Sequence, residues 1–288
     1  GLKVSDYGIK PKDAKKYKEF KTEEEFYAYL GMEWIPPELR EDRGEVSASL
    51  DKTMPRLVEI TDIKADLQIH SDFDIETSHD VGESSMERLI EKANLLGYEY
   101  LAFTEHNPSQ KGHNEKQIVE ILKRKSEKVE QINSSVKSVG SKSVKNKITA
   151  LGIVKTSVKK VFNSLEIDIL PDGKLPVSDK GLDLLDFALV SIHSSFRQSK
   201  KEATKRVLSA LSHPKVKIFA HPTGRKINER EGVELEWDKI FELALDKGKW
   251  IEINCDPMRL DLPDFLVKEA VDKGVMLTLG TDAHHVSG

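Results

Sequence analysis

Cysteine, long apolar runs and an excess of one charge are all scarce in this sequence. A single cysteine, Cys255, excludes a disulfide framework and fits a reducing compartment. No apolar run approaches the roughly 18 residues that cross a membrane, and the N-terminus has no secretory pattern. The net charge of −4 gives no overall attraction to nucleic acid. The sequence therefore predicts a soluble, cytoplasmic protein without a membrane partner.

The first part of the chain differs from the rest. Its 288 residues are 38% hydrophobic, enough for a sizeable core and for more than one domain. Thr22 followed by three glutamates predicts a helix that ends at Gly31, and we expect residues 1–45 to form a small separate unit. Residues 46–64 then form a linker, and 65–288 a larger domain. Because the chain starts with Gly1 and stops without a closing helix, we expect a fragment that is truncated at its C-terminus.

Apolar runs alternate with amphipathic segments of helix length after residue 65. Several of these segments end at a glycine, which is typical of βα units around a parallel sheet. Right-handed crossovers would let about seven units close into a barrel. Residues 134–160 lack periodicity and are expected to form a solvated surface insertion. The expected helices are Ser85–Leu96, Lys116–Ile132, Lys200–Leu211, Leu235–Asp246 and Leu262–Asp272.

Metal-binding residue types recur at the C-terminal ends of seven apolar runs. One such residue after one strand is usually a loop or core residue. Ligands at the same end of successive parallel strands, however, converge at the mouth of a barrel and indicate a polynuclear metal site. The sixth run is equivocal. The runs are Ala65–His70, Tyr100–His106, Ser164–Ile169, Phe187–His193, Val216–His221, Trp250–Asn254 and Met276–His284.

Alternation along two of these runs groups their polar side chains. Asp66, Gln68 and His70 share one face of their strand, and Asp282 and His284 share another. Buried together, such groups need partners, which a metal ion supplies. A hydrogen-bonded core triad is the alternative for the first run, and an ordinary loop with two histidines is the alternative for the second.

A further strand carries two carboxylates, Glu166 and Asp168. A carboxylate within an apolar strand is costly unless it is paired or coordinated, so Glu166 is a candidate to bridge two ions; an exposed edge strand is the alternative. Arg225 follows His221 in a glycine-containing turn and could hold a phosphate, or be an ordinary surface arginine. Most acidic loop residues are solvated, and the sequence does not choose among Asp72, Asp74, Glu76, His79 and Asp80.

The order of these motifs resembles the PHP (polymerase and histidinol phosphatase) domain, in the version fused to the C-terminus of bacterial and archaeal family X DNA polymerases. The N-terminal stretch from Thr22 to Glu41 is similar to the end of that polymerase core. The resemblance rests on Gln68-x-His70, Thr104-Glu105-His106, Glu166-Ile167-Asp168, His193-Ser194, His221-Pro222-Thr223-Gly224-Arg225, Glu252-Ile253-Asn254, Arg259-Leu260-Asp261-Leu262 and Asp282-Ala283-His284.

The resemblance implies a distorted seven-stranded (β/α) barrel with up to three divalent ions (Zn, Mn, Fe or Mg). It implies a phosphoesterase, typically a 3′ to 5′ exonuclease that processes gapped or single-stranded DNA ends in repair beside its own polymerase core. Glu166 and Arg225 would be catalytic, and Arg197, Arg225 and Arg259 would contact substrate. The ions would be held by Gln68, His70, Glu166 and Asp282; by Glu166, His193 and His221; and by His106, His284 and His79, with Asp80 as the next choice for the last position.

Two residues depart from the family pattern. Gln68 and Glu105 stand where the family usually has His and Asp. An amide oxygen is a weaker ligand than imidazole for zinc-like ions and favours harder Mn or Mg. Two rival interpretations follow: a small-molecule phosphatase of the histidinol phosphatase type, and a degenerate scaffold that binds DNA without cleaving it.

Overall fold

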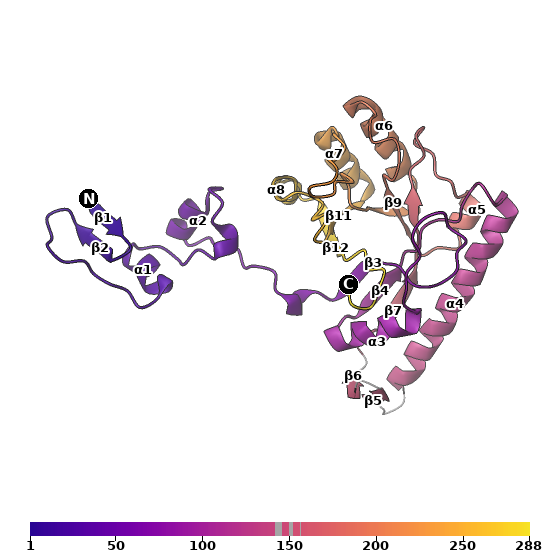
Figure 1. The fold of residues 1–288 in the computed structure, drawn as a ribbon, viewed down its shortest axis with the longest axis horizontal. Coiled ribbons are helices and arrows are strands. Elements are labelled where there is room, and N and C mark those ends of the chain that lie inside the picture. Colours follow the sequence, from indigo (N-terminus) through magenta and orange to yellow (C-terminus); the bar gives the residue numbers. More distant parts are fainter. Residues whose placement is uncertain (142–145, 150–151, 156) are drawn as a thin grey trace. The chain divides into compact units, whose positions relative to one another are not determined.

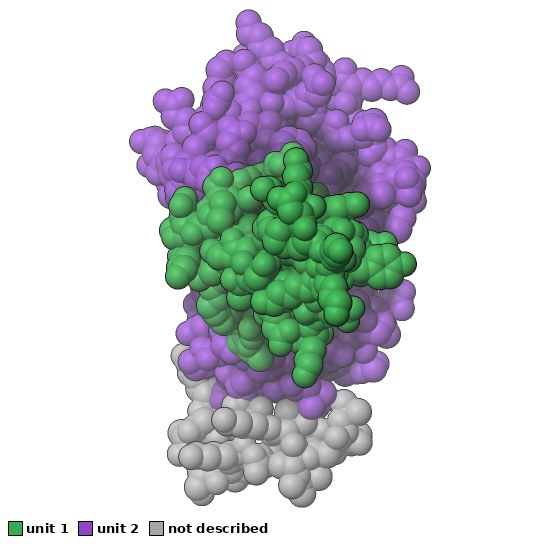
Figure 2. All heavy atoms as spheres, turned by 90° about the vertical axis from the view of Figure 1, so that its left-hand side faces the viewer, with its two compact units in different colours: residues 1–62 green, residues 63–288 purple. Residues whose placement is uncertain are grey.

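The computed structural model describes residues 1–141, 146–149, 152–155 and 157–288. The chain divides into two compact units, residues 1–62 and 63–288, which are coloured separately in Figure 2. The boundary lies within residues 46–64, the predicted linker. Each unit is described by itself.

The first unit contains one hairpin and short helices. Its strands β1 (Leu2–Ser5) and β2 (Gly8–Pro11) pair antiparallel. Helix α1 begins as predicted, because the Thr22 hydroxyl accepts a hydrogen bond from the Glu25 amide. The helices are α1 (Glu23–Tyr29), η1 (Pro37–Leu39), α2 (Glu45–Asp51) and η2 (Ile60–Asp62).

The second unit is an α/β fold with two parallel sheets, and each of the seven predicted apolar runs contains one of its strands. One sheet has the order β3-β4-β7, and the other has the order β12-β11-β10-β9-β8. The strands are β3 (Ala65–Ile69), β4 (Tyr100–Phe103), β7 (Lys160–Asn163), β8 (Glu166–Asp168), β9 (Ala188–Ser191), β10 (Val216–Phe219), β11 (Trp250–Asn254) and β12 (Met276–Gly280).

The expected seven-stranded barrel is not present as one closed sheet among the described residues. The chain changes sheets between β7, which pairs with β4, and β8, which pairs with β9. In the part of the chain that the structure describes, isolated bridges connect the two sheets, from Ile69 to Ala283 and from His106 to Glu166. The segment after β12 accordingly lies beside β3 (Figure 1). This break at residues 164–165 is the reason why two sheets replace one.

Helices cover the outer faces of the two sheets (Figure 1). The predicted helix ends are confirmed at Gly97, Gly248 and Gly274, which adopt the left-handed conformation that glycine tolerates. The short α5 was not predicted. The helices are α3 (Met86–Leu96), α4 (Glu115–Ser141), α5 (Asp179–Leu182), α6 (Lys200–Leu211), α7 (Trp237–Lys247) and α8 (Asp264–Lys273).

The segment 134–160, expected to form a solvated surface loop, contains regular secondary structure over much of its length. Helix α4 continues to Ser141, and strands β5 (Asn146–Thr149) and β6 (Gly152–Lys155) form an antiparallel hairpin. Strand β7 already begins at Lys160. The amphipathic pattern of α4 fades before its backbone hydrogen bonding ends, which explains the error. The expectation for 142–145, 150–151 and 156 lies outside the described residues.

The core of the second unit lies between the strands and their helices. Apolar residues of β8, β9 and β10, such as Ile167, Val190 and Phe219, are fully buried against α6 and α7. This packing brings the C-terminal ends of the strands to one edge, where the predicted ligands follow. Within the described ranges, no helix is both long and apolar enough to span a bilayer.

Candidate metal centre

The buried carboxylate of Glu166 lies at the centre of four histidines. Its Oε1 is 2.7 Å from His221 Nε2 and 3.2 Å from His193 Nε2. Its Oε2 is 3.3 Å from His70 Nε2 and 3.6 Å from His106 Nδ1. The two oxygens therefore face two different pairs of imidazoles. This is the arrangement of a carboxylate that can bridge two ions.

The cluster is assembled by strand ends. Glu166 opens β8 and points to the mouth, while each histidine follows a different strand, so parallel strands bring them together from distant parts of the sequence. Asp282 Oδ1 adds a second carboxylate 3.2 Å from His70 Nε2. Asp282 follows β12 and has a φ of 57°, an uncommon backbone conformation for a residue other than glycine.

Four overlapping groups of side chains could each hold an ion. Within each group, the ligand atoms lie within 4.8 Å of one another. The second expected set is brought together in full, and the first is brought together without counting Gln68. For the third, His106 and His284 meet His70, whereas His79 lies in another group. The groups are His70/Glu166/Asp282, Glu166/His193/His221, His70/His106/His284 and His79/His106/Asp168/His193.

Gln68 is fully buried beside the first group. Its Nε2 donates to Asp282 Oδ1 at 3.4 Å, and its Oε1 accepts from Asn254 Nδ2 at 3.5 Å. In this orientation the amide nitrogen, not the oxygen, faces Asp282. Gln68 would have to rotate its amide by half a turn to offer the oxygen that a cation requires.

Asp168 holds two of the predicted ligands. Its Oδ2 lies 2.7 Å from His79 Nε2, and its Oδ1 lies 2.7 Å from His193 Nδ1. A carboxylate on one ring nitrogen fixes the orientation of an imidazole and leaves the other nitrogen for a metal. For His193 that other nitrogen, Nε2, faces Glu166. His79 instead directs its Nε2 at Asp168.

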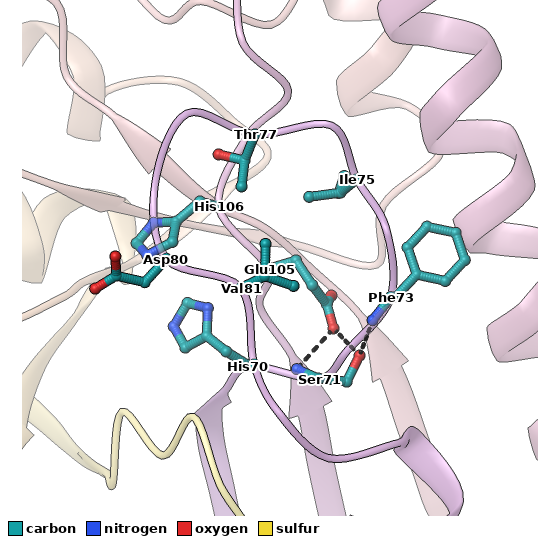
Figure 3. Close-up of a pocket in the computed structure, with 10 residues that line it drawn as sticks. His70, Ser71, Phe73, Ile75, Thr77, Asp80, Val81, Glu105 and His106 are labelled. Atoms are coloured by element: carbon teal, nitrogen blue, oxygen red, sulfur yellow. Dashed lines mark hydrogen bonds between the residues drawn. The ribbon is translucent and has the colours of Figure 1, made fainter.

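The loop over residues 71–84 passes beside His70 and His106 (Figure 3). The loop is closed at its base by two backbone hydrogen bonds, from Asp72 N to Ser84 O and from Glu83 N to His284 O. A Cβ on Gly82 would overlap the carbonyl of His70, so this close approach requires glycine. Asp80, the second loop candidate, is exposed and lines a pocket of the site together with His70 and His106.

Glu105 is turned away from the histidines. Its Oε1 accepts from the Ser71 amide at 3.2 Å and from the Ser71 hydroxyl at 2.5 Å (Figure 3). Its Oε2 lies 2.7 Å from the ammonium of Lys125, which is fully buried on α4 and also donates to the carbonyls of Phe103 and Ser164. Glu105, whose side chain is longer than the Asp usual at this position of the PHP domain, thus joins a buried ion pair. This pair anchors the start of the loop over residues 71–84.

The three candidate arginines have different surroundings. Arg225 Nε donates to the Arg259 carbonyl at 2.8 Å, and its Nη2 donates to the Leu260 carbonyl. Arg259 is nearly buried, with its Nε 3.5 Å from Asp282 Oδ2, while its Nε and Nη1 have no hydrogen-bond partner among the described residues. Arg197 is exposed. Of the three, Arg259 has buried N–H donors without a hydrogen bond in the described residues, beside the Asp282 carboxylate.

The charges of the cluster are strongly coupled. Burial opposes charge on His70 and His193, but their carboxylate neighbours outweigh it and raise the pKa of His70 to about 10 and that of His193 to about 9. Burial also opposes charge on Glu166, yet the surrounding histidines hold its pKa well below the usual range. His106 lacks such a close partner, and burial lowers its pKa to about 3.

Several buried polar atoms in the cluster have no hydrogen-bond partner in the described part of the chain. Buried polar groups are costly when they are unsatisfied, and imidazole nitrogens and carboxylate oxygens are good ligands for divalent ions. The residues therefore fit a metal centre. The unpartnered atoms include both ring nitrogens of His70, His106 Nδ1, Glu166 Oε2, His221 Nδ1 and His284 Nε2.

The expected site omitted four residues that support the cluster. Asp168 shares a strand face with Glu166, so alternation was a signal for it. Glu252 Oε2 accepts from the His221 amide at 2.7 Å, and Asn254 Nδ2 donates to Asp282 Oδ2 at 3.3 Å; both lie on the equivocal sixth run. Burial raises the pKa of Glu252 well above its usual range. Lys125 gave no signal, because helical lysines are usually exposed.

The fold and cluster define a class: an α/β protein whose parallel strand ends carry a histidine- and carboxylate-rich site for divalent ions. The family described as DNA polymerase beta thumb matches residues 1–41. The chain is 35% identical over 286 residues to the DNA polymerase/3′-5′ exonuclease PolX of Bacillus subtilis (strain 168), covering 99% of this chain and 45% of that protein. It therefore spans less than half the length of that relative.

Two further proteins are similar over shorter or more divergent stretches. One is named "Probable phosphatase", from Thermoanaerobacter sp. (strain X514), and is 29% identical over 134 residues, covering 43% of this chain and 52% of that protein. The other is the crystal structure of histidinol phosphate phosphatase from Lactococcus lactis subsp. lactis complexed with Zn, L-histidinol and phosphate. Its TM-score is 0.49 at 18% identity, covering 77% of this chain and 87% of that one.

The thumb match and the similarity to PolX confirm the resemblance found in the sequence, to the PHP domain of a family X DNA polymerase.

Proposed function

We propose that the PHP domain of this chain is a metal-dependent phosphodiesterase that removes nucleotides from the 3′ end of DNA. The observation that carries the proposal is the position of Glu166, whose two oxygens face separate histidine pairs at 2.7 to 3.6 Å. A centre with two ions joined by one carboxylate suits in-line displacement at phosphorus, because attacking and leaving oxygens both need stabilising.

Under this proposal, the side chains divide into two ion sites and a third, outer one. His70 and Asp282, with Gln68 after rotation of its amide, would hold one ion with Glu166; His193 and His221 would hold the second. His106 and His284 would contribute to the third, with His79 or Asp80 from the loop. When bound, the ions supply charge neutralisation at the phosphate and lower the pKa of water.

The residues of the chain itself would bind and orient the substrate. Arg259 has N–H groups that make no hydrogen bond in the described residues, next to Asp282, and would donate to a phosphate oxygen. Arg225 would act through Arg259, by holding its backbone carbonyl. Exposed Arg197 would contact the strand further from the cluster. DNA ends, and the polymerase core that precedes the thumb in the family, are the proposed partners.

The test is a nuclease assay with the full chain and Mn²⁺, using single-stranded DNA labelled at its 5′ end. We expect a ladder of products shortened one nucleotide at a time from the 3′ end. His193→Ala and Asp282→Ala should each lose roughly a thousandfold in rate, the scale of removing an essential group from a preorganised site. The matched control is His213→Ala, because His213 contacts exposed Asp179 at the opposite end of β10. Undiminished activity in both site variants would refute the assignment.

A further inference from the structure

Three large apolar side chains are exposed at the mouth of the site, and we call them the apolar rim: Ile227, Met258 and Leu260. Their exposed fractions are 36%, 48% and 50%. Ile227 lies in the loop after β10, whereas Met258 and Leu260 lie in the loop after β11. Both loops leave the strand ends that carry the metal cluster, and the Ile227 amide joins them by donating to the Met258 carbonyl at 2.7 Å.

The rim is fixed by its backbone rather than by burial of its side chains. Asn254 and Asp261 exchange two backbone hydrogen bonds that close the loop at its base. Leu260 has a φ of 42°, a left-handed conformation that is strained for a bulky residue, and Arg225 donates to its carbonyl. The loop therefore holds an exposed leucine in place at a conformational cost, instead of letting it turn inward.

A phosphate-binding group stands between the two apolar residues of this loop. Arg259 follows Met258 and precedes Leu260. Its Nε lies 3.5 Å from Asp282 Oδ2 and 3.9 Å from Asp256 Oδ2, but Nε and Nη1 make no hydrogen bond within the described residues. A guanidinium with N–H donors not used in hydrogen bonds favours an oxyanion. The segment thus offers one site for a phosphate oxygen flanked by two apolar surfaces, beside the carboxylate of Asp282.

A nucleotide combines the two chemistries that this segment can recognise. Its phosphate would meet Arg259, and the apolar face of its base would cover the rim. The base must be unpaired and unstacked to offer that face. A purely apolar protein partner would leave the Arg259 donors unsatisfied, and a simple phosphate ester without a base would leave the rim in water.

We propose that Ile227, Met258 and Leu260 bind the unpaired base of the nucleotide whose phosphate Arg259 holds. The rim thereby makes the site selective for nucleotide ends over base-free phosphate esters. This inference rests on the proposed function for the position of the phosphate. It adds recognition of the base, the part of the substrate that the metal-binding residues do not contact.

The test compares two DNA strands that differ only at the 3′ end. Both are single-stranded, carry a 5′ fluorophore and have phosphorothioate linkages at the last positions to slow hydrolysis; one ends in thymidines and the other in abasic residues. The full, Mn²⁺-loaded chain should bind the thymidine end about tenfold more tightly, the scale on which a site discriminates a missing apolar group. Fluorescence anisotropy gives both dissociation constants.

The decisive variant is Met258→Ser with Leu260→Gly, because glycine accepts the left-handed backbone at position 260 and so preserves the loop. We expect its base preference to fall to about one, the value for a site that contacts no base. Val271→Ser is the control, since Val271 is 59% exposed near the end of α8 away from the mouth, and it should keep the wild-type preference.

A base preference in the double variant equal to that of the wild type would overturn the inference, as would no preference in the wild type. Cleavage is a separate readout, measured on the thymidine-ended strand with ordinary linkages. Its absence in the wild type alongside an intact base preference would refute the proposed hydrolysis while supporting the rim.

Discussion

The guanidinium of Arg225 is bonded to the backbone of Arg259, with Arg225 Nε 2.8 Å from the Arg259 carbonyl. The carboxylate of Asp261 completes the same contact between loops, because it accepts from the amides of Thr223 and Gly224. The loops after β10 and β11 are therefore held as one piece. Of the two arginines, Arg225 positions the loop and Arg259 faces the site.

Replacing these arginines should give different signatures. Arg259→Ala should raise KM for DNA about tenfold with little change in the free energy of unfolding, since it removes a charge-assisted contact to phosphate. Arg225→Ala should lower both activity and stability. Arg225→Lys should not restore them, because an ammonium lacks the planar fork that spans two carbonyls. Steady-state kinetics and urea denaturation of the three variants provide the measurement; equal stability losses for Arg225→Ala and Arg259→Ala would contradict these roles.

The buried pair of Lys125 and Glu105 should be sensitive to loss of one partner. Lys125→Met leaves the Glu105 carboxylate buried without its cation, and we expect a loss of about 3 to 5 kcal/mol in the free energy of unfolding. The double variant Lys125→Met/Glu105→Gln should recover a large part of that loss. Urea denaturation of the metal-free proteins measures both. A loss below 1 kcal/mol for Lys125→Met would show that the pair does not anchor the loop.

Metal binding should displace protons. In the metal-free chain the pKa values of His70 and His193 are raised to about 10 and about 9, so both rings are protonated at pH 7. An ion needs neutral imidazole, so binding should release about two protons there, and affinity should rise with pH up to that range. Calorimetric titration in buffers of different ionisation enthalpy counts the protons. Binding without proton release would contradict the raised values.

The raised pKa values of His70 and His193 also determine whether the stability of the metal-free chain rises or falls with pH. Because the folded-state pKa values lie above the unfolded value of about 6.5, the histidine–carboxylate contacts stabilise the metal-free chain fully below that pH. This stabilisation is lost as pH rises through about 9 and 10. Denaturation of the metal-free chain across this range should therefore show falling stability, which bound metal reverses.

Asp168 should act through the histidines that it contacts. Asp168→Asn should weaken metal affinity by about 10- to 100-fold, as is common when a carboxylate behind a ligating histidine is removed. His79→Ala should leave the second ion site at His193 and His221 intact and affect only an ion on the loop side. Competition with a chelating indicator measures each affinity. Unchanged affinity in Asp168→Asn would show that it does not orient His193.

The seven strands within the predicted apolar runs and most helices of the second unit could be predicted, because their signals are local. Residues alternate in type along β3 and β8, and glycines at 97, 248 and 274 mark the helix ends. The convergence of Glu166 with His193 and His221 could also be predicted, since strand direction alone brings these residues to one edge of the sheet. Each of these inferences needs only a short window of sequence and the rule of parallel βα order.

The rest depends on contacts between distant segments. The break between β7 and β8 arises because these two short strands pair with different neighbouring strands. Residues 160–169 alone do not determine that pairing. The pairing of His79 with Asp168 depends on how the loop after β3 crosses the mouth. Likewise, nothing next to Arg225 in the sequence shows that its partners are the carbonyls of residues 259 and 260.

The central claim is that Glu166 joins two ions, and a count of bound metal tests it most directly. Elemental analysis of the full chain after Mn²⁺ loading and gel filtration should give at least about two ions per chain, as expected of a two-metal site. Glu166→Gln, which keeps the shape but removes the charge, should lower the count by at least one ion. Fewer than two ions in the wild type, or an unchanged count in Glu166→Gln, would contradict the account.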